Sequence, residues 1–335
     1  MMTFMETGSI WVVPNKSREA GIGCLMVTIV AFTHCLLPPQ ASAQLVSSFP
    51  WQSELYTDHE LIGRIWDSRR GQFVTDAELW DSILESSYVL LGEKHDNPDH
   101  HALQLRVLQA LISADNVDKL TMEMLDGTAS ENLDAFLETS FESEEALKNF
   151  LNWDDQGWSW AYYGALIQAA HRAGVPVTAG NLDTESVMQV YSSPTTSEIE
   201  AVLDAEVVNR LLADIDESHC GLLPESQFPP MVRVQQTRDH TMARSLLLDD
   251  EKNHGLAVLI AGNYHARKDL GVPNYLIAQH PELEWSDILS LAFLEVVPDV
   301  MDPRAYLDQF SDRSAYDFIW FTPAVSNADY CDSMR

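Results

Sequence analysis

The chain has few lysines and a large excess of acidic residues. It carries 51 Asp and Glu against 20 Lys and Arg, and only six of the basic residues are Lys, which gives a formal net charge of −31. Nucleic acids and anionic membrane surfaces are polyanions and would repel such a chain. We therefore expect no nucleic-acid partner.

Several catalytic and binding motifs are also missing. The sequence has no G-x-S-x-G motif, no glycine-rich loop ahead of a helix and no C-x-x-C pair. This excludes a nucleophile elbow, a phosphate-cradling loop and a cysteine-based zinc site in their usual forms. There is no low-complexity segment and no clear linker after residue 50, so we expect one domain over residues 44–335.

The first 43 residues are predicted to be a signal peptide that is removed. Basic residues precede an apolar run from Gly21 to Leu37, and Ala41-Ser42-Ala43 is a small-x-small cleavage site before Gln44. The alternative is an uncleaved anchor. Cys24 and Cys35 fit a lipoprotein site poorly, so a lipid anchor is doubtful. We expect an exported protein, either periplasmic or associated with the outer membrane.

Cleavage would leave two cysteines, Cys220 and Cys331. An even pair in an oxidising compartment most simply forms one disulfide, and the alternative of a cysteine metal site lacks suitable spacing. We predict the disulfide, which would tie the C-terminal tail to the middle of the chain.

One stretch combines a buried strand with ionisable side chains. The apolar run from Tyr88 to Leu91 predicts a strand, and Gly92 allows a turn before Glu93 and His95. The following segment predicts a helix out to about residue 113, with Asn97 as N-cap and a proline at its first position. Open α/β sheets bind ligands where such strands end, so Glu93 and His95 are candidate site residues.

A second stretch has the same pattern. The strand predicted from Leu256 ends at Gly262, and His265 follows as the second G-x-x-H motif. A further strand, predicted from Lys119 to Leu125, carries Glu123, and burial of an acid in an apolar strand is costly unless it is paired or liganded. We expect both histidines and Glu123 to face one crevice.

The remaining pattern alternates helices and strands, which predicts an α/β fold with a mostly parallel sheet and flanking helices. An N-terminal hairpin is predicted to precede it. The expected elements are a hairpin around residues 61–74, helices at 76–85, 128–139, 143–151, 183–191, 198–217, 230–250 and from 273, and strands at 175–179, 289–297 and 318–321.

The strand ends allow two interpretations. His95 and His265 with Glu93 or Glu123 could hold a divalent metal or act in catalysis. Alternatively, these residues cap the strand ends in a hydrogen-bonded network. His100 and His101 lie in the first turn of a helix and point apart, so they do not form a self-contained zinc site.

An aromatic-rich segment around Trp158, Trp160 and Tyr163 is equally open to two interpretations. The small and apolar residues that continue at helical spacing favour a helix packed on the sheet. The other interpretation is the wall of a pocket for a large flat ligand.

The chain resembles the ChaN-like haem-binding proteins of the haem-uptake/Tiki superfamily, which also includes TraB. The matching pieces cover roughly residues 55–325. They are Leu90-Leu-Gly-Glu-Lys-His-Asp-Asn-Pro-Asp-His-His101, Trp160-Ala-Tyr-Tyr163, Ser218-His-Cys-Gly-Leu-Leu-Pro224, the segment 231–243 and the segment 259–276.

The resemblance implies an EreA/ChaN-like α/β fold and an exported haem-binding protein that acts in iron acquisition. It implies Tyr163 as candidate iron ligand, and a large apolar wall with cations for the haem propionates. Possible partners are an outer-membrane haem receptor and a second copy of the chain. The implied cofactor-binding residues are Tyr163, His95, His265, Trp160 and Arg267.

Tiki-type relatives are regarded as metal-dependent proteases built on paired G-x-x-H motifs, which gives a second interpretation. A metal-dependent hydrolase would use Glu93, His95, Glu123, Arg238 and His265, with the metal on His95, His265 and Glu93. A third interpretation is a non-catalytic binding protein on the same scaffold.

Overall fold

A computed structural model describes residues 49–193, 197–248, 255–307, 313–328 and 331. The chain from Ala43 to Arg335 forms one structural unit. The predicted signal peptide, residues 1–43, lies outside the described residues. In the part of the chain that the structure describes, no helix is both long and apolar enough to cross a membrane.

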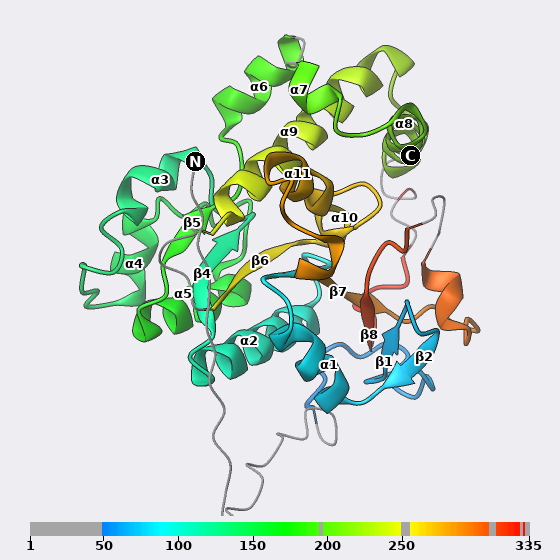
Figure 1. Cartoon of the computed structure of the whole chain (residues 1–335), viewed down its shortest axis with the longest axis horizontal. Coiled ribbons are helices and arrows are strands. Elements are labelled where there is room, and N and C mark those ends of the chain that lie inside the picture. The colour runs from blue at the N-terminus through cyan, green and yellow to red at the C-terminus, as the bar shows by residue number, and fades with distance from the viewer. Residues whose placement is uncertain (1–48, 194–196, 249–254, 308–312, 329–330, 332–335) are drawn as a thin grey trace, which may run out of the picture. The chain divides into compact units, whose positions relative to one another are not determined.

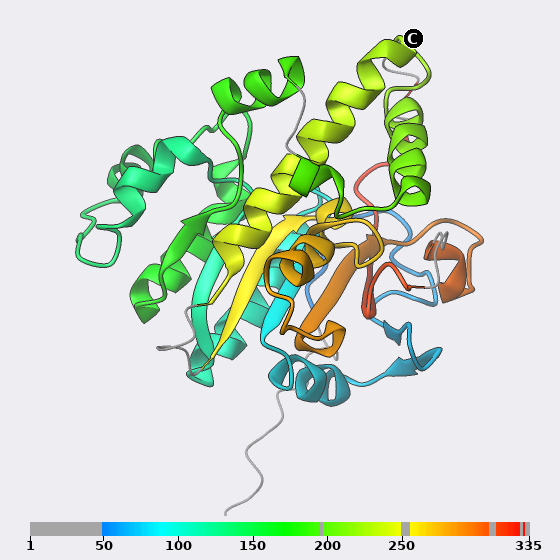
Figure 2. The ribbon, with the colours of Figure 1, turned by 45° about the horizontal axis from the view of Figure 1, so that its top comes forward.

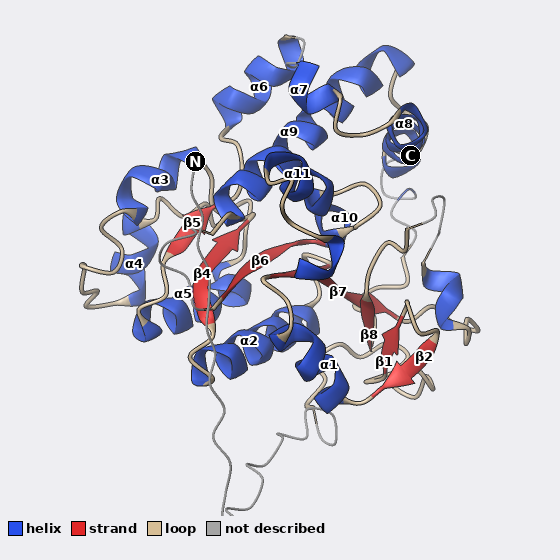
Figure 3. Cartoon of the chain, in the orientation of Figure 1, coloured by secondary structure: helices blue, strands red, loops and turns tan. Residues whose placement is uncertain are grey.

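The centre of the fold is an eight-stranded sheet in the order β2-β1-β8-β7-β3-β6-β4-β5 (Figures 1 and 3). The six strands from β8 to β5 run parallel, and β1 pairs antiparallel with β8 and with β2. The strands are β1 Ile65–Asp67, β2 Gln72–Val74, β3 Tyr88–Glu93, β4 Val117–Met122, β5 Val177–Ala179, β6 Leu256–Gly262, β7 Ile288–Glu295 and β8 Phe318–Thr322. The predicted mostly parallel α/β fold with an N-terminal hairpin is therefore confirmed.

Helices cover both faces of this sheet. They are α1 Asp76–Leu84, α2 Pro98–Ser113, α3 Gly127–Leu133, α4 Glu144–Phe150, α5 Trp160–Ala173, α6 Thr184–Ser192, α7 Ser197–Glu200, α8 Ala205–Ser218, α9 Phe228–Leu246, α10 Asn263–Ala266 and α11 Val272–Gln279, with short 3-10 turns η1 Glu225–Gln227, η2 Trp285–Asp287 and η3 Pro303–Tyr306.

The two faces of the sheet have separate cores because neighbouring residues of a strand point to opposite sides. In β3, Val89 and Leu91 pack with α1, α2 and α5, whereas Tyr88 and Leu90 pack with α8, α9 and α11. Figures 1 and 2 show α6, α7 and α8 gathered around α9, beyond the edge of the sheet where the parallel strands end.

Most predicted elements are present, with three differences. The sequence predicts Asp76 as the cap of the helix at 76–85, but Thr75 caps α1 and forms a capping box with Glu78. The helix predicted over 198–217 is divided into α7 and α8, because Asp204 caps a new helix by accepting from the backbone N–H groups of Glu206 and Val207. The strand predicted to reach Leu125 ends at Met122, so Glu123 follows the strand.

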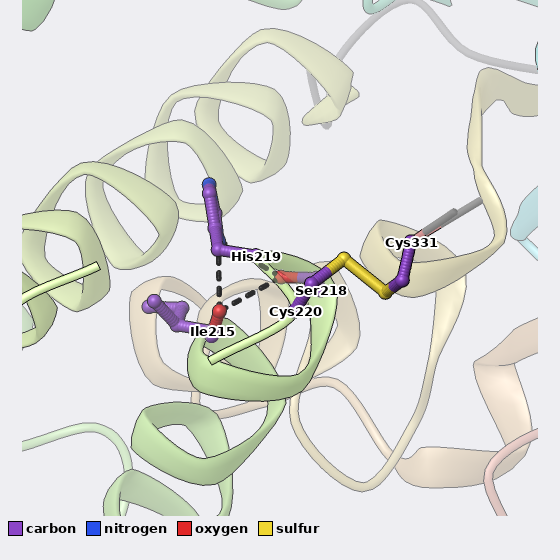
Figure 4. The surroundings of a disulfide bond; sticks show 5 residues. All are labelled: Ile215, Ser218, His219, Cys220 and Cys331. Atoms are coloured by element: carbon purple, nitrogen blue, oxygen red, sulfur yellow. Dashed lines mark hydrogen bonds between the residues drawn. A yellow bond between two sulfur atoms is a disulfide. The ribbon is translucent and has the colours of Figure 1, made fainter. Parts of the chain in front are cut away.

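The predicted disulfide between Cys220 and Cys331 is present (Figure 4). Cys220 lies just after α8 and has a positive φ of 60°, a conformation that costs about 1–2 kcal/mol for a residue with a side chain. The bond fixes the C-terminal Cys331 beside this turn.

Candidate functional site

Glu93 is the centre of a buried network at the C-terminal end of β3. It is 2% exposed. Its Oε1 accepts hydrogen bonds from the Tyr163 hydroxyl at 2.5 Å and from His95 Nδ1 at 2.9 Å, and its Oε2 lies 3.0 Å from His101 Nδ1. A buried carboxylate is stable only with such partners, so Tyr163, His95 and His101 together compensate its charge.

Glu123 links this cluster to the end of β6. Its Oε2 accepts from the backbone N–H of Gly262 at 2.7 Å and lies 4.0 Å from His95 Nε2. Its Oε1 lies 3.4 Å from Nε2 of His265. An ideal Cβ on Gly262 would meet His95 Nε2 at 2.8 Å, so only glycine permits this approach of the two strand ends.

His265 lies between two carboxylates. Its Nδ1 donates to Asp239 Oδ1 at 2.6 Å, and its Nε2 faces Glu123. Asp239 lies on α9 and is 1% exposed, so α9 and the end of β6 hold the imidazole from two sides.

The electrostatics of the network keep Glu93, Glu123 and His265 ionised, whereas burial raises the pKa of Asp239. Burial alone would raise the pKa of Glu93, but the hydrogen bonds and charges of His101 and His95 outweigh it and lower the pKa to about 2. Burial would also raise the pKa of Glu123, but the charge and hydrogen bond of His265 outweigh it and lower the pKa to about 2. For His265, burial would lower the pKa, but Glu123 and Asp239 raise it to about 10, so the ring is a cation at neutral pH.

The structure therefore joins four of the five residues predicted for catalysis: Glu93, His95, Glu123 and His265. The fifth, Arg238 on α9, lines a cavity together with Glu123. Its buried Nε has no hydrogen-bond partner among the described residues.

The residues predicted to bind a cofactor are placed differently. Tyr163 and Trp160 belong to the core, at 1% and 7% exposure, so Trp160 is a packing residue and not a pocket wall. Iron could reach the Tyr163 hydroxyl only after its bond to Glu93 is broken, and burial beside Glu93 raises the pKa of the phenol. Arg267 is buried in a bidentate pair with Asp269, so it is not available for a propionate.

The divalent metal predicted on His95, His265 and Glu93 has no preformed site. Over the described ranges, no group of three or more His, Cys, Asp or Glu side chains is arranged to hold an ion. The reason is that each imidazole already faces a carboxylate: His95 Nδ1 bonds Glu93, and His265 contacts Asp239 and Glu123.

Sequence reasoning misses two members of the network. The spacing of His100 and His101 indicates only that they point apart, yet His101 turns toward Glu93 while His100 accepts from the Lys94 backbone. Asp239 resembles part of a solvated charge run on α9. Its position seven residues after Val232 and three before Met242, on the buried stripe of α9, is the available signal for burial.

Two cavities adjoin this network, and Arg238 and Val187 line both. The smaller, about 320 Å³, is bordered by Glu123 and by Trp153 and Trp158. The larger, about 600 Å³, lies among α6, α8, α9 and Tyr264. Its lining residues are mostly apolar or aromatic: Val187, Tyr191, Leu211, Asp214, Ile215, Ser218, His219, Met231, Val234, Gln235, Arg238 and Tyr264.

The fold and site thus define an α/β protein with an ionised strand-end network beside an apolar cavity. The family model described as "Haem-binding uptake, Tiki superfamily, ChaN" matches residues 79–276. The chain belongs to this family, which confirms the resemblance seen in the sequence.

Among solved structures, the chain is similar to ChaN of Campylobacter jejuni, described with cofacial haem binding. The TM-score is 0.61 at 24% identity, over 76% of this chain and 95% of that one. At this identity the similarity shows the fold. A mutant erythromycin esterase in its open conformation gives a TM-score of 0.38 at 15% identity, over 65% of this chain and 72% of the esterase. No curated protein matches the chain.

Proposed function

We propose that the chain binds haem in the 600 Å³ cavity among α6, α8 and α9. The observation that carries this proposal is an apolar cavity of suitable size in a member of a haem-binding family. Ligand pockets commonly have volumes of about 300–1,000 Å³, with apolar walls and a few polar groups that fix orientation. Leu211, Ile215 and Val234 supply such a wall, and Tyr191 and Tyr264 add aromatic surface.

Arg238 is the cation best placed for a haem propionate. It borders the cavity and forms no ion pair with any residue in the described part of the chain. An arginine fork binds a carboxylate through two parallel hydrogen bonds. The sequence-based choice, Arg267, and its neighbour Lys268 are already paired with Asp269 and Asp317.

Haem bound there would supply an iron centre, and the protein would supply an apolar wall, an anchor for a propionate and a rigid support for the cavity. The strand-end network provides that support. Asp239 binds His265 from α9, and Gln235, one turn away on the same helix, lies on the cavity wall and 3.1 Å from His265 Nδ1.

Haemin titration of the chain Gln44–Arg335, followed by visible absorption, tests this proposal. We expect a saturable Soret shift with micromolar or tighter affinity. Val234→Trp would fill the cavity and should weaken binding at least tenfold, whereas Val297→Trp, on an exposed loop, is the matched control and should bind as the wild type does. Absence of a saturable shift, or equal binding by both variants, would overturn the proposal.

Export and iron acquisition form the biological part of the proposal. The signal peptide predicted over residues 1–43 supports it, together with a disulfide of the kind that persists in oxidising compartments. An outer-membrane haem receptor and a second copy of the chain are the proposed partners. The mass of the protein recovered from a cell envelope tests removal of this segment, with Gln44 expected as the first residue and an intact N-terminus as the contrary result.

Hydrolysis is the second candidate function. The favouring observation is the pair of carboxylate–imidazole contacts, Glu93 with His95 and Asp239 with His265, with the His95 side chain 42% exposed beside Trp158. However, a general base must be unprotonated at neutral pH. His265, with a pKa of about 10, is protonated there and cannot act as that base. Ester and peptide hydrolysis assays with and without a chelator, compared between wild type and His95→Asn, test this candidate. Turnover that His95→Asn does not reduce would eliminate it.

A further inference from the structure

The larger cavity has one wall that is packed on the sheet and one that lies beyond it. Helix α9 contacts β4, β5, β6 and α11, so its side of the cavity belongs to the rigid core. Helix α8 packs chiefly against α9 and lies beyond the edge of the sheet (Figures 1 and 2). Part of the cavity lining comes from α8 and the position after it: Leu211, Asp214, Ile215, Ser218 and His219. A movement of α8 would therefore change the shape of the cavity.

The second half of α8 is only weakly anchored by packing. The side chains of α8 that are fully buried, Val207 and Leu211, both lie in its first half, and those further along, such as Ile215, are partly buried. A segment with few buried contacts opens at a low cost in free energy. This half is held in place by the hydrogen bond that the Tyr264 hydroxyl donates to Asp214 at 2.6 Å, and by the disulfide that follows the last turn.

The disulfide also holds the end of α8 in a turn that side chains disfavour. Cys220 and Gly221 follow the helix with φ angles of 60° and 65°. Glycine adopts such a conformation freely, whereas a residue with a Cβ does so at a cost. The bond joins Cys220 to Cys331, 111 positions later in the sequence (Figure 4). Cleavage of this bond would allow the turn to relax and would remove the anchor at the cavity end of α8.

The disulfide is accessible to a reductant. Both cysteines are half-buried, and the neighbouring Ser218 and Gly221 are exposed. A dithiol reduces such a bond by exchange: its thiolate attacks one sulfur, the other cysteine leaves and takes up a proton, and the second thiol of the reductant then displaces the first cysteine. Two electrons and two protons pass to the protein, which ends with two thiols, while the reductant ends as a disulfide.

We propose that the Cys220–Cys331 disulfide is a redox latch on the wall of the larger cavity. The oxidised bond holds the second half of α8 against the cavity and its ligand. Reduction by a dithiol lets this half of α8 move away and lowers the affinity of the cavity. The inference rests on the proposed function for the identity of the ligand, haem, and adds the chemical condition under which the ligand is released.

The test measures binding of gallium protoporphyrin by fluorescence, because a dithiol does not change the oxidation state of this metal. It compares the oxidised wild type, the wild type reduced with dithiothreitol, the double variant Cys220→Ser, Cys331→Ser, and Leu108→Ala. Leu108 is fully buried on the opposite face of the sheet, so its truncation destabilises the chain away from the cavity.

We expect the reduced chain and the double variant to bind the porphyrin about tenfold more weakly than the oxidised chain, a common size for the coupling between two sites. Reoxidation should restore the affinity of the reduced chain, and Leu108→Ala should bind as the oxidised wild type does. Equal affinity of the oxidised and reduced chains overturns the latch. A disulfide that dithiothreitol leaves intact in the folded protein, as the mass after alkylation shows, also overturns it.

Two further outcomes separate the latch from lowered stability and from the proposed function. A loss of binding by Leu108→Ala as large as that of the double variant overturns the latch, because lower stability would then explain both. An oxidised wild type that does not bind the porphyrin overturns the proposed function. Amide hydrogen exchange of the ligand-free chain then decides the latch by itself. Faster exchange on reduction that is confined to residues 212–218 supports it, and unchanged or uniformly faster exchange overturns it.

Discussion

Replacement of Glu93 by glutamine tests whether the strand-end network is a set of buried charges. The pKa of Glu93 falls from an ordinary value of 4.5 to about 2 in the folded protein. At about 1.4 kcal/mol per unit, this difference contributes about 3 kcal/mol to stability at neutral pH. The variant also leaves His95 and His101 without their anion, which typically costs about 3–5 kcal/mol for a broken buried pair.

The sign of the pH dependence follows from the lowered pKa. The contribution of Glu93 is fully present above pH 4.5 and is lost as the pH falls through about 2. We therefore expect the difference in unfolding free energy between wild type and Glu93→Gln to stay constant from pH 7 to about pH 4.5 and to shrink from there toward pH 3. Urea denaturation over this range measures it.

Glu138→Gln provides the control, because Glu138 is exposed and its loss should change stability little at any pH. A difference below about 1 kcal/mol at pH 7 would refute the reasoning, since a paired buried charge cannot be removed so cheaply. A large difference that stays constant from pH 7 to pH 3 would show that packing, not charge, is responsible.

Three further predictions follow from the same structure. The pKa of His265 is raised from 6.5 to about 10, so its contribution to stability is fully present below pH 6.5 and is lost as the pH rises through 10. Wild-type stability should therefore fall over that interval. The urea midpoint of His265→Asn should depend less on pH. The double variant Cys220→Ser, Cys331→Ser should lose about 4–5 kcal/mol in the chain-entropy model, measured by urea denaturation, because the disulfide spans 111 residues; an unchanged midpoint would contradict this. Arg238→Gln should weaken haemin binding about tenfold and leave the melting temperature within a few degrees, whereas Arg304→Gln, whose partner is the exposed Asp302, should leave binding unchanged.

The strand ends are predictable because their signals are local. The apolar runs, the Asn97 cap and the glycines at the ends of β3 and β6 place Glu93, His95 and His265 at the same edge of a parallel sheet. The two G-x-x-H motifs are 170 positions apart in the sequence (265 minus 95) and meet because β3 and β6 are adjacent. The family then follows from the combination of motifs.

The role of each side chain is not predictable in the same way. Tyr163 reads as a candidate ligand from its residue type, but helix α5 directs its hydroxyl to a buried carboxylate 70 residues earlier in the chain. The sequence suggests Arg267 as a cation for a haem propionate, but the structure pairs it with Asp269. The cavity among α6, α8 and α9 depends on how three helices pack, which no local pattern encodes.

The most direct test of haem binding in this cavity is the position of the iron. Anomalous scattering at the iron edge, measured on crystals of the haem-loaded chain, locates it without assumptions about the ligand. We predict one iron per bound haem within the cavity that Leu211, Val234 and His219 line. An iron beside Tyr163 and Glu93, or one held only at the outer surface, would contradict the account.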